Sequence, residues 1–321
     1  MGHFFLTLLI LLFYGIGYFS GAVNMAGRTF VTYNRWLSRV YFTVSEPLAA
    51  RSQPPAPPVV APAPPAPAPP VLLPALTLSA TSAVAVDLDS GQNLFAQNAD
   101  YVQPIASITK LMTALVFLDH NPGWDKVYQF KTADRRESQT SFFAGDKVKI
   151  KDLFAAMLIA SDNSAVAGLV SATGLSESEF VAKMNTKAAQ LGLTATRFVD
   201  PTGLDEGDVS TARDVAWLAR QALAHTEISQ TSLSSSYNFT TQQGKHRRIY
   251  STDKLLTGLK NGIAIEGGKT GYIIRAGYCF VGKFNYNQQN IITVVLGAGN
   301  PTARFSETTR LLEWVYQDQG G

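Results

Sequence analysis

Residues 104–119 read PIASITKLMTALVFLD and place Ser107 three positions before Lys110. The run from Ile108 to Leu118 has helical periodicity, and positions three apart on a helix share a face, so the amine can reach the hydroxyl. This helix is apolar nearly all round, which predicts burial. Burial beside a second cation lowers a lysine pKa until the free amine can accept a proton. We interpret the pair as a nucleophile and its base; the alternative is a capping serine and a solvated lysine.

The Ser-x-x-Lys spacing is not specific alone, because Ser251 and Lys254 repeat it. Two further motifs make the combination specific. Ser-Asp-Asn at 161–163 lies in AAMLIASDNSAVAGLV, where apolar flanks predict a buried connection between helices whose polar side chains need partners. Lys-Thr-Gly at 269–271 follows two glycines and precedes a predicted strand. The three motifs in this order indicate acyl-transfer chemistry at a serine.

With these motifs the chain resembles the low-molecular-mass penicillin-binding D-alanyl-D-alanine peptidases, serine peptidase family S11. The resemblance rests on PIASITKLMTALV, LIASDNSAVA, FVDPTGLDEGDVSTARDVAWLA and GGKTGY, and it covers residues 76–316. It is greatest to the short D-Ala-D-Ala endopeptidases, because we expect no domain beyond the final helix. It implies cleavage of peptidoglycan stem peptides through an acyl-enzyme, with β-lactam antibiotics as inhibitors and no cofactor.

Roles follow from the resemblance, motif by motif. It implies that Ser107 attacks a carbonyl between two D-residues, that neutral Lys110 takes the proton, and that Ser161 passes a proton to the leaving amine. It implies an oxyanion site made by the backbone N–H groups of Ser107 and Tyr272. Substrate binding is assigned to four residues: Asn163, Lys269, Thr270 and Gly271.

One position departs from the family pattern. Ile273 stands where members often have a threonine, so one hydroxyl for a substrate carboxylate is missing. Arg275 is either its replacement or a surface arginine. Two other functions stay open: a class A-like β-lactamase, which needs a positioned glutamate and water for deacylation, and a non-catalytic penicillin-binding sensor or scaffold.

The order of patterns predicts an α/β (α+β) fold of the β-lactamase/transpeptidase-like type. An antiparallel sheet is built from N- and C-terminal strands, and a helical subdomain is inserted between them. A hairpin is expected around Ser90 and Gly91, and strands in GYCFVGKF and NIITVVLGAG. Helices are expected at 108–118, 150–171, 176–191, 211–224 and 302–316.

The first quarter of the chain predicts attachment to a membrane. Residues 4–23 are apolar and uncharged, which suits a bilayer-spanning anchor or an export signal. Residues 54–74 hold eleven of the sixteen prolines, typical of an extended spacer. We expect four parts: anchor or signal 1–23, an aromatic and arginine-containing juxtamembrane segment 24–53, a linker 54–75, and a peptidase domain 76–321. The protein is expected outside the cytoplasm, tethered or secreted, although arginines after the span favour the opposite orientation.

Composition excludes other classes. A net charge of +3 without a lysine or arginine block argues against nucleic-acid binding. Cys279 is the only cysteine, so no internal disulfide or thiolate cluster forms, and its strand-like surroundings predict a buried thiol. The four histidines lack ligand spacing, so no metal site is expected.

Overall fold

The computed structural model describes residues 76–136, 139–259 and 262–317. The predicted anchor, juxtamembrane segment and linker lie outside these ranges. Within them, no helix combines the length and the apolar character that crossing a bilayer requires.

A five-stranded antiparallel sheet forms the base of the domain, in the order β2-β1-β11-β10-β9. It unites the two ends of the domain, since β1 and β2 come from its N-terminal part and β9 to β11 from its C-terminal part. The strands are β1 (Ser82–Asp87), β2 (Asn93–Gln97), β9 (Ala264–Ile273), β10 (Gly277–Tyr286) and β11 (Gln289–Ala298). The predicted sheet and the hairpin at Ser90 are confirmed.

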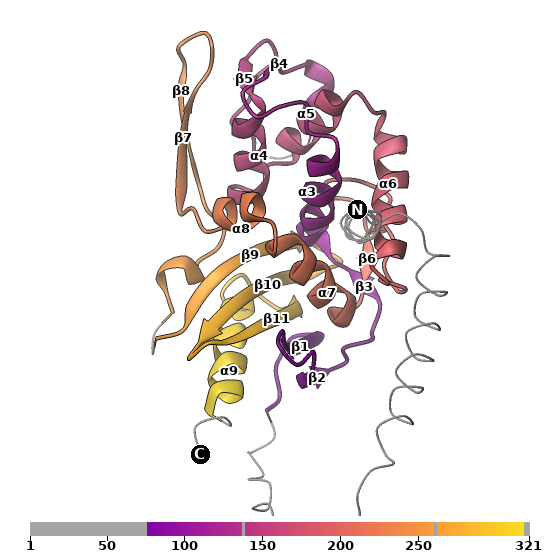
Figure 1. The fold of residues 1–321 in the computed structure, drawn as a ribbon, viewed down its shortest axis with the longest axis vertical. Coiled ribbons are helices and arrows are strands. Elements are labelled where there is room, and N and C mark those ends of the chain that lie inside the picture. The colour runs from indigo at the N-terminus through magenta and orange to yellow at the C-terminus, as the bar shows by residue number, and fades with distance from the viewer. Residues whose placement is uncertain (1–75, 137–138, 260–261, 318–321) are drawn as a thin grey trace, which may run out of the picture. The chain divides into compact units, whose positions relative to one another are not determined.

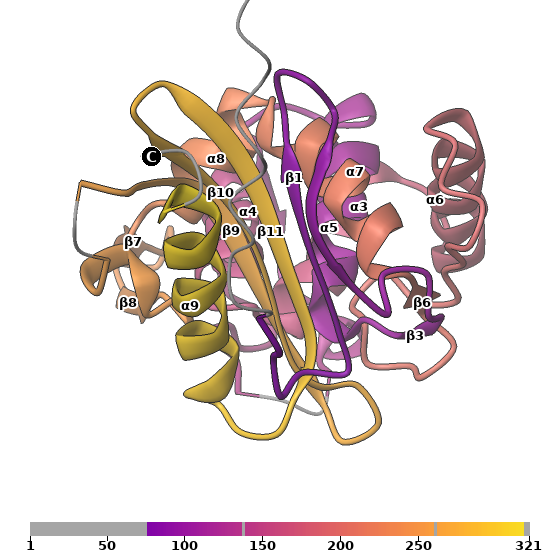
Figure 2. The ribbon, with the colours of Figure 1, turned by 90° about the horizontal axis from the view of Figure 1, so that it is seen from below.

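The central strands are buried on both faces, because helices cover each side (Figure 2). Helix α9 (Ala303–Gln317) packs on one face, and α7 (Ala212–Leu223) packs on the other. Cys279 lies within β10 and is fully buried, which confirms its predicted packing role. Burial raises the pKa of its thiol to about 11, so it is not a thiolate at neutral pH.

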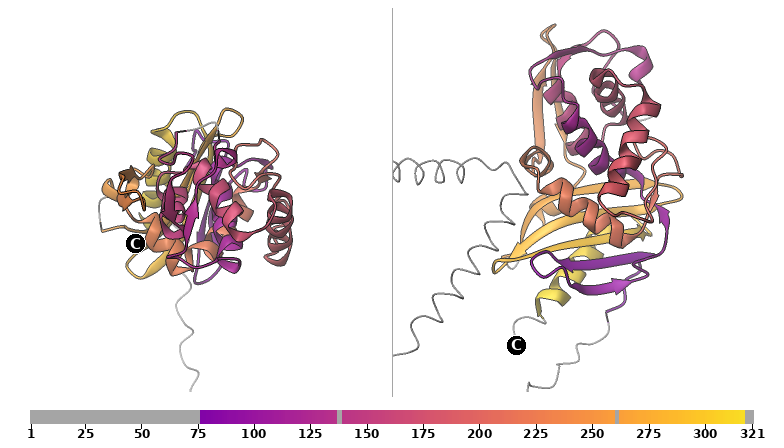
Figure 3. Two further views of the ribbon diagram at one scale, coloured as in Figure 1. Left: turned by 90° about the horizontal axis from the view of Figure 1, so that it is seen from above. Right: turned by 45° about the vertical axis from the view of Figure 1, so that its right-hand side comes forward.

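The helical subdomain stands on the α7 side of the sheet (Figures 1 and 3). Its core is continuous with that side of the sheet, so one apolar cluster joins both layers. The helices are α3 (Lys110–Asp119), α4 (Ile150–Ile159), α5 (Asn163–Thr173), α6 (Glu177–Gln190) and α8 (Thr226–Ser232), with the 3₁₀ turns η1 (Ala106–Thr109) and η2 (Thr132–Asp134). A third 3₁₀ turn, η3 (Leu255–Thr257), packs through Leu255 into the core on the α9 side of the sheet.

Three short two-stranded sheets also belong to the described part of the chain. They are β3 (Gln103–Pro104) with β6 (Val209–Ser210), β4 (Val127–Gln129) with β5 (Lys147–Lys149), and β7 (Ser236–Thr240) with β8 (His246–Tyr250). The β7–β8 hairpin runs alongside the helices and contacts α4 (Figure 1). Neither these strand pairs nor α8 was predicted from the sequence.

Two sequence predictions are corrected. The helix expected at 150–171 is two helices, because Ser161 adopts φ +59° and the Asp162 carboxylate caps α5 by accepting from the Ala165 N–H at 3.0 Å. The Lys-Thr-Gly motif lies within β9, not before a strand, since the strand begins at Ala264. The helices expected at 176–191 and 211–224 are confirmed; side-chain caps from Ser176 and Thr211 begin them.

Candidate active site

Ser107 and Lys110 meet at the start of α3. Ser107 lies in η1, and Lys110 is the first residue of the α-helix, so the helical turn brings the two side chains together. Lys110 Nζ lies 2.8 Å from Ser107 Oγ, 2.6 Å from Asn163 Oδ1 and 2.6 Å from the carbonyl oxygen of Thr202. Lys110 is fully buried, which argues against the alternative of a solvated lysine.

Burial lowers the pKa of Lys110 to about 7. A charged amine loses its hydration in this interior, so the neutral form is favoured. The carboxylates of Asp200, Asp162 and Asp208 act in the opposite direction and raise this pKa. The predicted burial effect is therefore present, and the acids offset part of it. The expected second cation is Lys269, whose own pKa is lowered by the charge of Lys110.

The Ser-Asp-Asn motif joins the two lysines of the site. Ser161 Oγ accepts a hydrogen bond from Lys269 Nζ at 2.9 Å, and Asn163 Oδ1 accepts from Lys110. Ser161 lies between α4 and α5 and has a left-handed backbone conformation, with φ +59°. This conformation is strained for a residue with a Cβ. Since the Asn163 carbonyl oxygen is engaged by Lys110, its amide nitrogen is the group left to donate to a substrate.

The Lys-Thr-Gly motif lies on β9, the edge strand of the sheet. Lys269 is buried and donates to Ser161 Oγ and to the Thr270 carbonyl at 2.8 Å. Burial, followed by the charges of Lys110 and Arg304, lowers the pKa of Lys269 well below its usual value. A free strand edge offers unpaired backbone groups, so a peptide can pair along it.

Gly271 and Gly203 allow two backbone segments to pack closely against the backbone around Ser107. A Cβ at Gly271 would stand 3.2 Å from the Ser107 nitrogen and 3.0 Å from the Ile105 carbonyl oxygen. Gly203 has φ +78°, and a Cβ there would overlap the Ala106 carbonyl. The β9 strand thus passes directly beside the Ser107 N–H, and Tyr272 is the next residue along it.

Sequence reasoning missed several residues of this cluster. Thr252 Oγ1 lies 2.6 Å from Thr270 Oγ1, and Arg304 Nη1 donates to the Gly271 carbonyl at 3.1 Å. Asp253 is buried close to β9, and burial raises its carboxyl pKa to about 6 against the charges of Lys269 and Arg304. Nothing in the sequence of the final helix distinguishes Arg304.

Solvent exposure decides the roles of Arg275 and Lys254, for which the sequence left two interpretations. Arg275 has 72% of its side chain exposed and lies 3.6 Å from Glu206, so it is a surface arginine. Lys254 of the second Ser-x-x-Lys is exposed, unlike Lys110, which makes that match a coincidence. Ile273 packs against the core and contributes no hydroxyl.

The sequence profile of peptidase S11, D-alanyl-D-alanine carboxypeptidase, matches residues 67–300. The chain belongs to this S11 family. It is 33% identical over 246 residues to a D-alanyl-D-alanine endopeptidase of Pseudomonas aeruginosa, covering 75% of this chain and 79% of that protein. It is 36% identical over 241 residues to a D-alanyl-D-alanine endopeptidase of Haemophilus influenzae, covering 73% and 81%. The predicted family is confirmed.

Solved structures of this fold agree with the S11 assignment. The Streptomyces K15 DD-transpeptidase superposes with a TM-score of 0.71 at 26% identity, covering 76% of this chain and all of that one. Penicillin-binding protein D2 of Listeria monocytogenes in its cefotaxime-bound form has a TM-score of 0.67 at 33% identity, with the same coverage. The predicted transpeptidase-like fold is confirmed.

Proposed function

We propose that this S11 chain is a serine D-alanyl-D-alanine peptidase that cleaves peptidoglycan stem peptides and is acylated by β-lactams. The observation that carries the proposal is the 2.8 Å contact between the Ser107 hydroxyl and the amine of a buried lysine. A family relationship alone does not establish an intact site. Here the three motifs converge in one hydrogen-bonded cluster, which supports a competent enzyme over a non-catalytic sensor.

In the first half of the reaction, neutral Lys110 accepts the Ser107 proton as Oγ bonds to the carbonyl carbon between two D-residues. The tetrahedral oxyanion accepts hydrogen bonds from the N–H groups of Ser107 and Tyr272; removing one such donor in other acyl-transfer enzymes costs about 2.7–4 kcal/mol. The C–N bond then breaks, and Ser161 delivers a proton to the departing amine while the proton that Lys110 took from Ser107 replaces it, so that Lys110 is neutral again. Lys269, 2.9 Å from Ser161 Oγ, stabilises that serine's developing negative charge.

In the second half, water bonds to the acyl carbon and gives a proton to neutral Lys110. The bond between that carbon and Ser107 Oγ then breaks, Lys110, 2.8 Å away, returns the proton to Oγ, and the acid product leaves. Asn163 Nδ2 and the β9 backbone hold the substrate in extended form, and Thr270 and Gly271 line its path. Class A β-lactamases deacylate with a positioned glutamate. Glu206 is exposed and its nearest ionic partner is Arg275, so it does not serve in that role. This favours the peptidase over the β-lactamase.

The test uses the full-length protein in a neutral detergent, with fluorescent penicillin and cross-linked muropeptides as substrates. Cleavage of the peptide bond with slow antibiotic turnover supports the peptidase, rapid antibiotic turnover supports a β-lactamase, and stable labelling without cleavage supports a sensor. Ser107→Ala should abolish both labelling and cleavage while changing the melting temperature little. A Ser107→Ala protein that still becomes labelled removes Ser107 from the mechanism.

We also propose that the peptidase acts outside the cytoplasm, tethered by residues 4–23 as a membrane anchor, with residues 54–75 as the spacer. The apolar length of the first segment and the proline content of the second support this arrangement. Peptidoglycan as substrate requires the extracytoplasmic side. Protease treatment of intact spheroplasts tests the orientation, because it should digest the peptidase domain only if that domain faces outward.

A further inference from the structure

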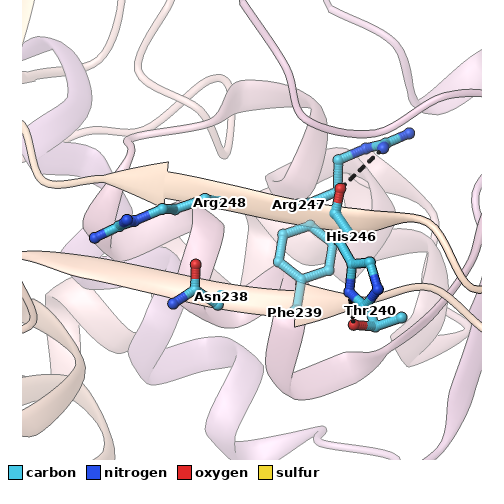
Figure 4. Close-up of a pocket in the computed structure, with 6 residues that line it drawn as sticks. All are labelled: Asn238, Phe239, Thr240, His246, Arg247 and Arg248. Carbon is cyan, nitrogen blue, oxygen red and sulfur yellow. Dashed lines mark hydrogen bonds between the residues drawn. The ribbon is translucent and has the colours of Figure 1, made fainter.

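The hollow on the β7–β8 hairpin contains no buried charge. Its volume is about 370 Å³, and every residue that lines it belongs to the hairpin (Figure 4). Arg247 and Arg248, the two arginines of this lining, are at least partly exposed, so water can hydrate their charges. A charged group that is fully buried and has no part in the proposed reaction lies elsewhere, at Asp208.

Asp208 closes the loop of residues 199–208. Its Oδ1 accepts hydrogen bonds from the Val199 N–H at 2.7 Å and from the Asp200 N–H at 3.1 Å. Its own carbonyl oxygen accepts from the Ile105 N–H at 3.0 Å, two residues before the nucleophile. Asp208 is 0% exposed, so it is fixed in the interior beside the segment that carries the nucleophile.

A chain of three hydrogen bonds connects Asp208 to the amine of Lys110. Asp208 accepts from the Asp200 N–H, and the Asp200 carboxylate accepts from the Thr202 N–H at 2.5 Å. The Thr202 carbonyl oxygen in turn accepts from Lys110 Nζ at 2.6 Å. Asp208 therefore helps to place the acceptor that holds the Lys110 amine beside Ser107.

Asp208 also keeps one carboxyl oxygen without a donor. Within the part of the chain that the structure describes, neither Asp208 Oδ2 nor the hydroxyl of Thr109, the residue before Lys110, has a hydrogen-bond partner. The other two acids that act on Lys110 accept hydrogen bonds on both carboxyl oxygens; they are Asp162 and Asp200. Of the three, Asp208 thus has the charge least neutralised by donors, and a charge in a buried site of low dielectric constant acts strongly on its neighbours.

The charge of Asp208 opposes the effect of burial on Lys110. Burial lowers the pKa of Lys110, whereas three carboxylates raise it: those of Asp200, Asp162 and Asp208. Lys269 is the nearby cation, and the charge of Lys110 lowers its pKa. Burial, together with the charge of Asp200, raises the pKa of Asp208 to about 7. Above that pH, Asp208 is an anion while the Lys110 amine is neutral.

We propose that Asp208 is a positioning residue that stabilises the ammonium form of Lys110 while Ser107 is acylated. The proposal rests on the proposed function, in which Lys110 gains a proton as Ser107 Oγ bonds to the carbonyl carbon. A negative charge fixed in the interior favours the charged amine of the transition state over the neutral amine of the ground state. Asp208 neither gains nor loses a proton in this step, so it acts through Lys110 alone.

The test follows labelling of the full-length Asp208→Asn protein by fluorescent penicillin from pH 5.5 to 8.5 in a neutral detergent. An asparagine has nearly the same size, and its side-chain oxygen can accept from the Val199 and Asp200 N–H groups, so the variant removes the charge and keeps the loop closed. The midpoint of the acylation profile should move about 0.5 to 1 pH unit lower, because the ammonium form of Lys110 loses a favourable neighbour. The plateau above pH 8 should fall about 3- to 10-fold, because the amine becomes a weaker base.

The melting temperature distinguishes this role from a structural one. At pH 8 the Asp208→Asn protein should melt above wild type, because the raised pKa of Asp208 means that ionisation of this carboxyl disfavours the folded state. Slower acylation in a more stable protein is not expected from loss of a structural contact.

Asp87→Asn is the matched control. Asp87 is also a buried carboxylate that accepts from two backbone N–H groups, at 3.0 and 2.7 Å, but β10 and β11 separate its strand from β9. It should leave the midpoint and the plateau unchanged. A wild-type midpoint, an undiminished plateau or a lowered melting temperature in Asp208→Asn overturns the proposal while the peptidase assignment stands. A wild-type protein that penicillin does not label overturns the proposed function, and this proposal with it.

Discussion

Acylation of Ser107 should depend on pH through the amine of Lys110. Burial lowers the pKa of Lys110 to about 7 from its ordinary 10.5, and only the neutral amine can take the Ser107 proton. At pH 7 about half of the molecules carry a neutral amine, whereas an ordinary lysine would be neutral in about 0.03% of them. The environment thus increases the competent base by about a thousandfold. The rate constant for penicillin acylation should rise about tenfold per pH unit below 7 and level off above it.

The assay follows the initial rate of labelling by fluorescent penicillin from pH 5.5 to 8.5 at constant ionic strength. Lys110→Met should abolish labelling at every pH, because no other amine lies within hydrogen-bond distance of Ser107 Oγ in the part of the chain that the structure describes. Lys254→Met, in the exposed second Ser-x-x-Lys, is the control and should behave as wild type. A flat pH profile, or labelled Lys110→Met protein, would refute the role of Lys110.

The same pKa change affects stability. The unfolded chain, with a lysine pKa near 10.5, binds more protons than the folded chain between pH 7 and 10.5, so Lys110 makes stability rise with pH in that window. The drop to about 7 corresponds to at most about 5 kcal/mol. The melting temperature of wild type relative to Lys110→Met should therefore increase from pH 6 to pH 10. A constant difference would contradict the depressed pKa.

Three further changes test neighbouring parts of the site. Asp253→Asn should stabilise the fold at pH 7 more than at pH 4, by up to about 3 kcal/mol. The reason is that burial raises the pKa of the Asp253 carboxyl in the folded protein to about 6, so the ionised form present at pH 7 is penalised. Thermal melts of both proteins at the two pH values measure this difference. Gly271→Ala should slow penicillin acylation at least about tenfold, since the new methyl group would press on the Ser107 nitrogen, whereas Gly299→Ala, with open space around its Cβ, should not. Ile273→Thr should lower KM for peptides with a free terminal carboxylate by supplying a hydroxyl, measured by D-alanine release; an unchanged KM would show that this position does not face the carboxylate.

The sequence predicted the fold where its patterns are local. Alternation identified β10 and β11, and helical periodicity identified α6 and α7. The short pairs such as β7–β8 escaped detection because their strands have five or fewer residues and mix polar and aromatic side chains without clear alternation. The β7–β8 pair packs on α4 through contacts that are tertiary and so leave no local sequence signal.

The motifs predicted most of the candidate site. The residues that were not predicted escaped for one reason. Thr252 and Arg304 reach β9 from segments whose local sequence shows no chemistry. The break at Ser161 is likewise invisible in hydrophobic periodicity, because α4 and α5 are both apolar and the serine between them is positioned by a left-handed backbone. Packing between distant segments decides these features.

Backbone strain is concentrated where the motifs meet. Ala106 and Ser161 both have positive φ, +49° and +59°, at residues with a Cβ, and conformations of this kind cost about 1–3 kcal/mol each. The Gly203 backbone packs directly against the Ala106 carbonyl group, where a Cβ on residue 203 would not fit. The Ser161 hydroxyl accepts a hydrogen bond from buried Lys269. The surrounding fold thus holds two unfavourable backbone conformations that direct the Ser107 and Ser161 hydroxyls toward the two lysines. Because the backbone itself sets these orientations, the hydroxyls need little reorientation when acylation begins.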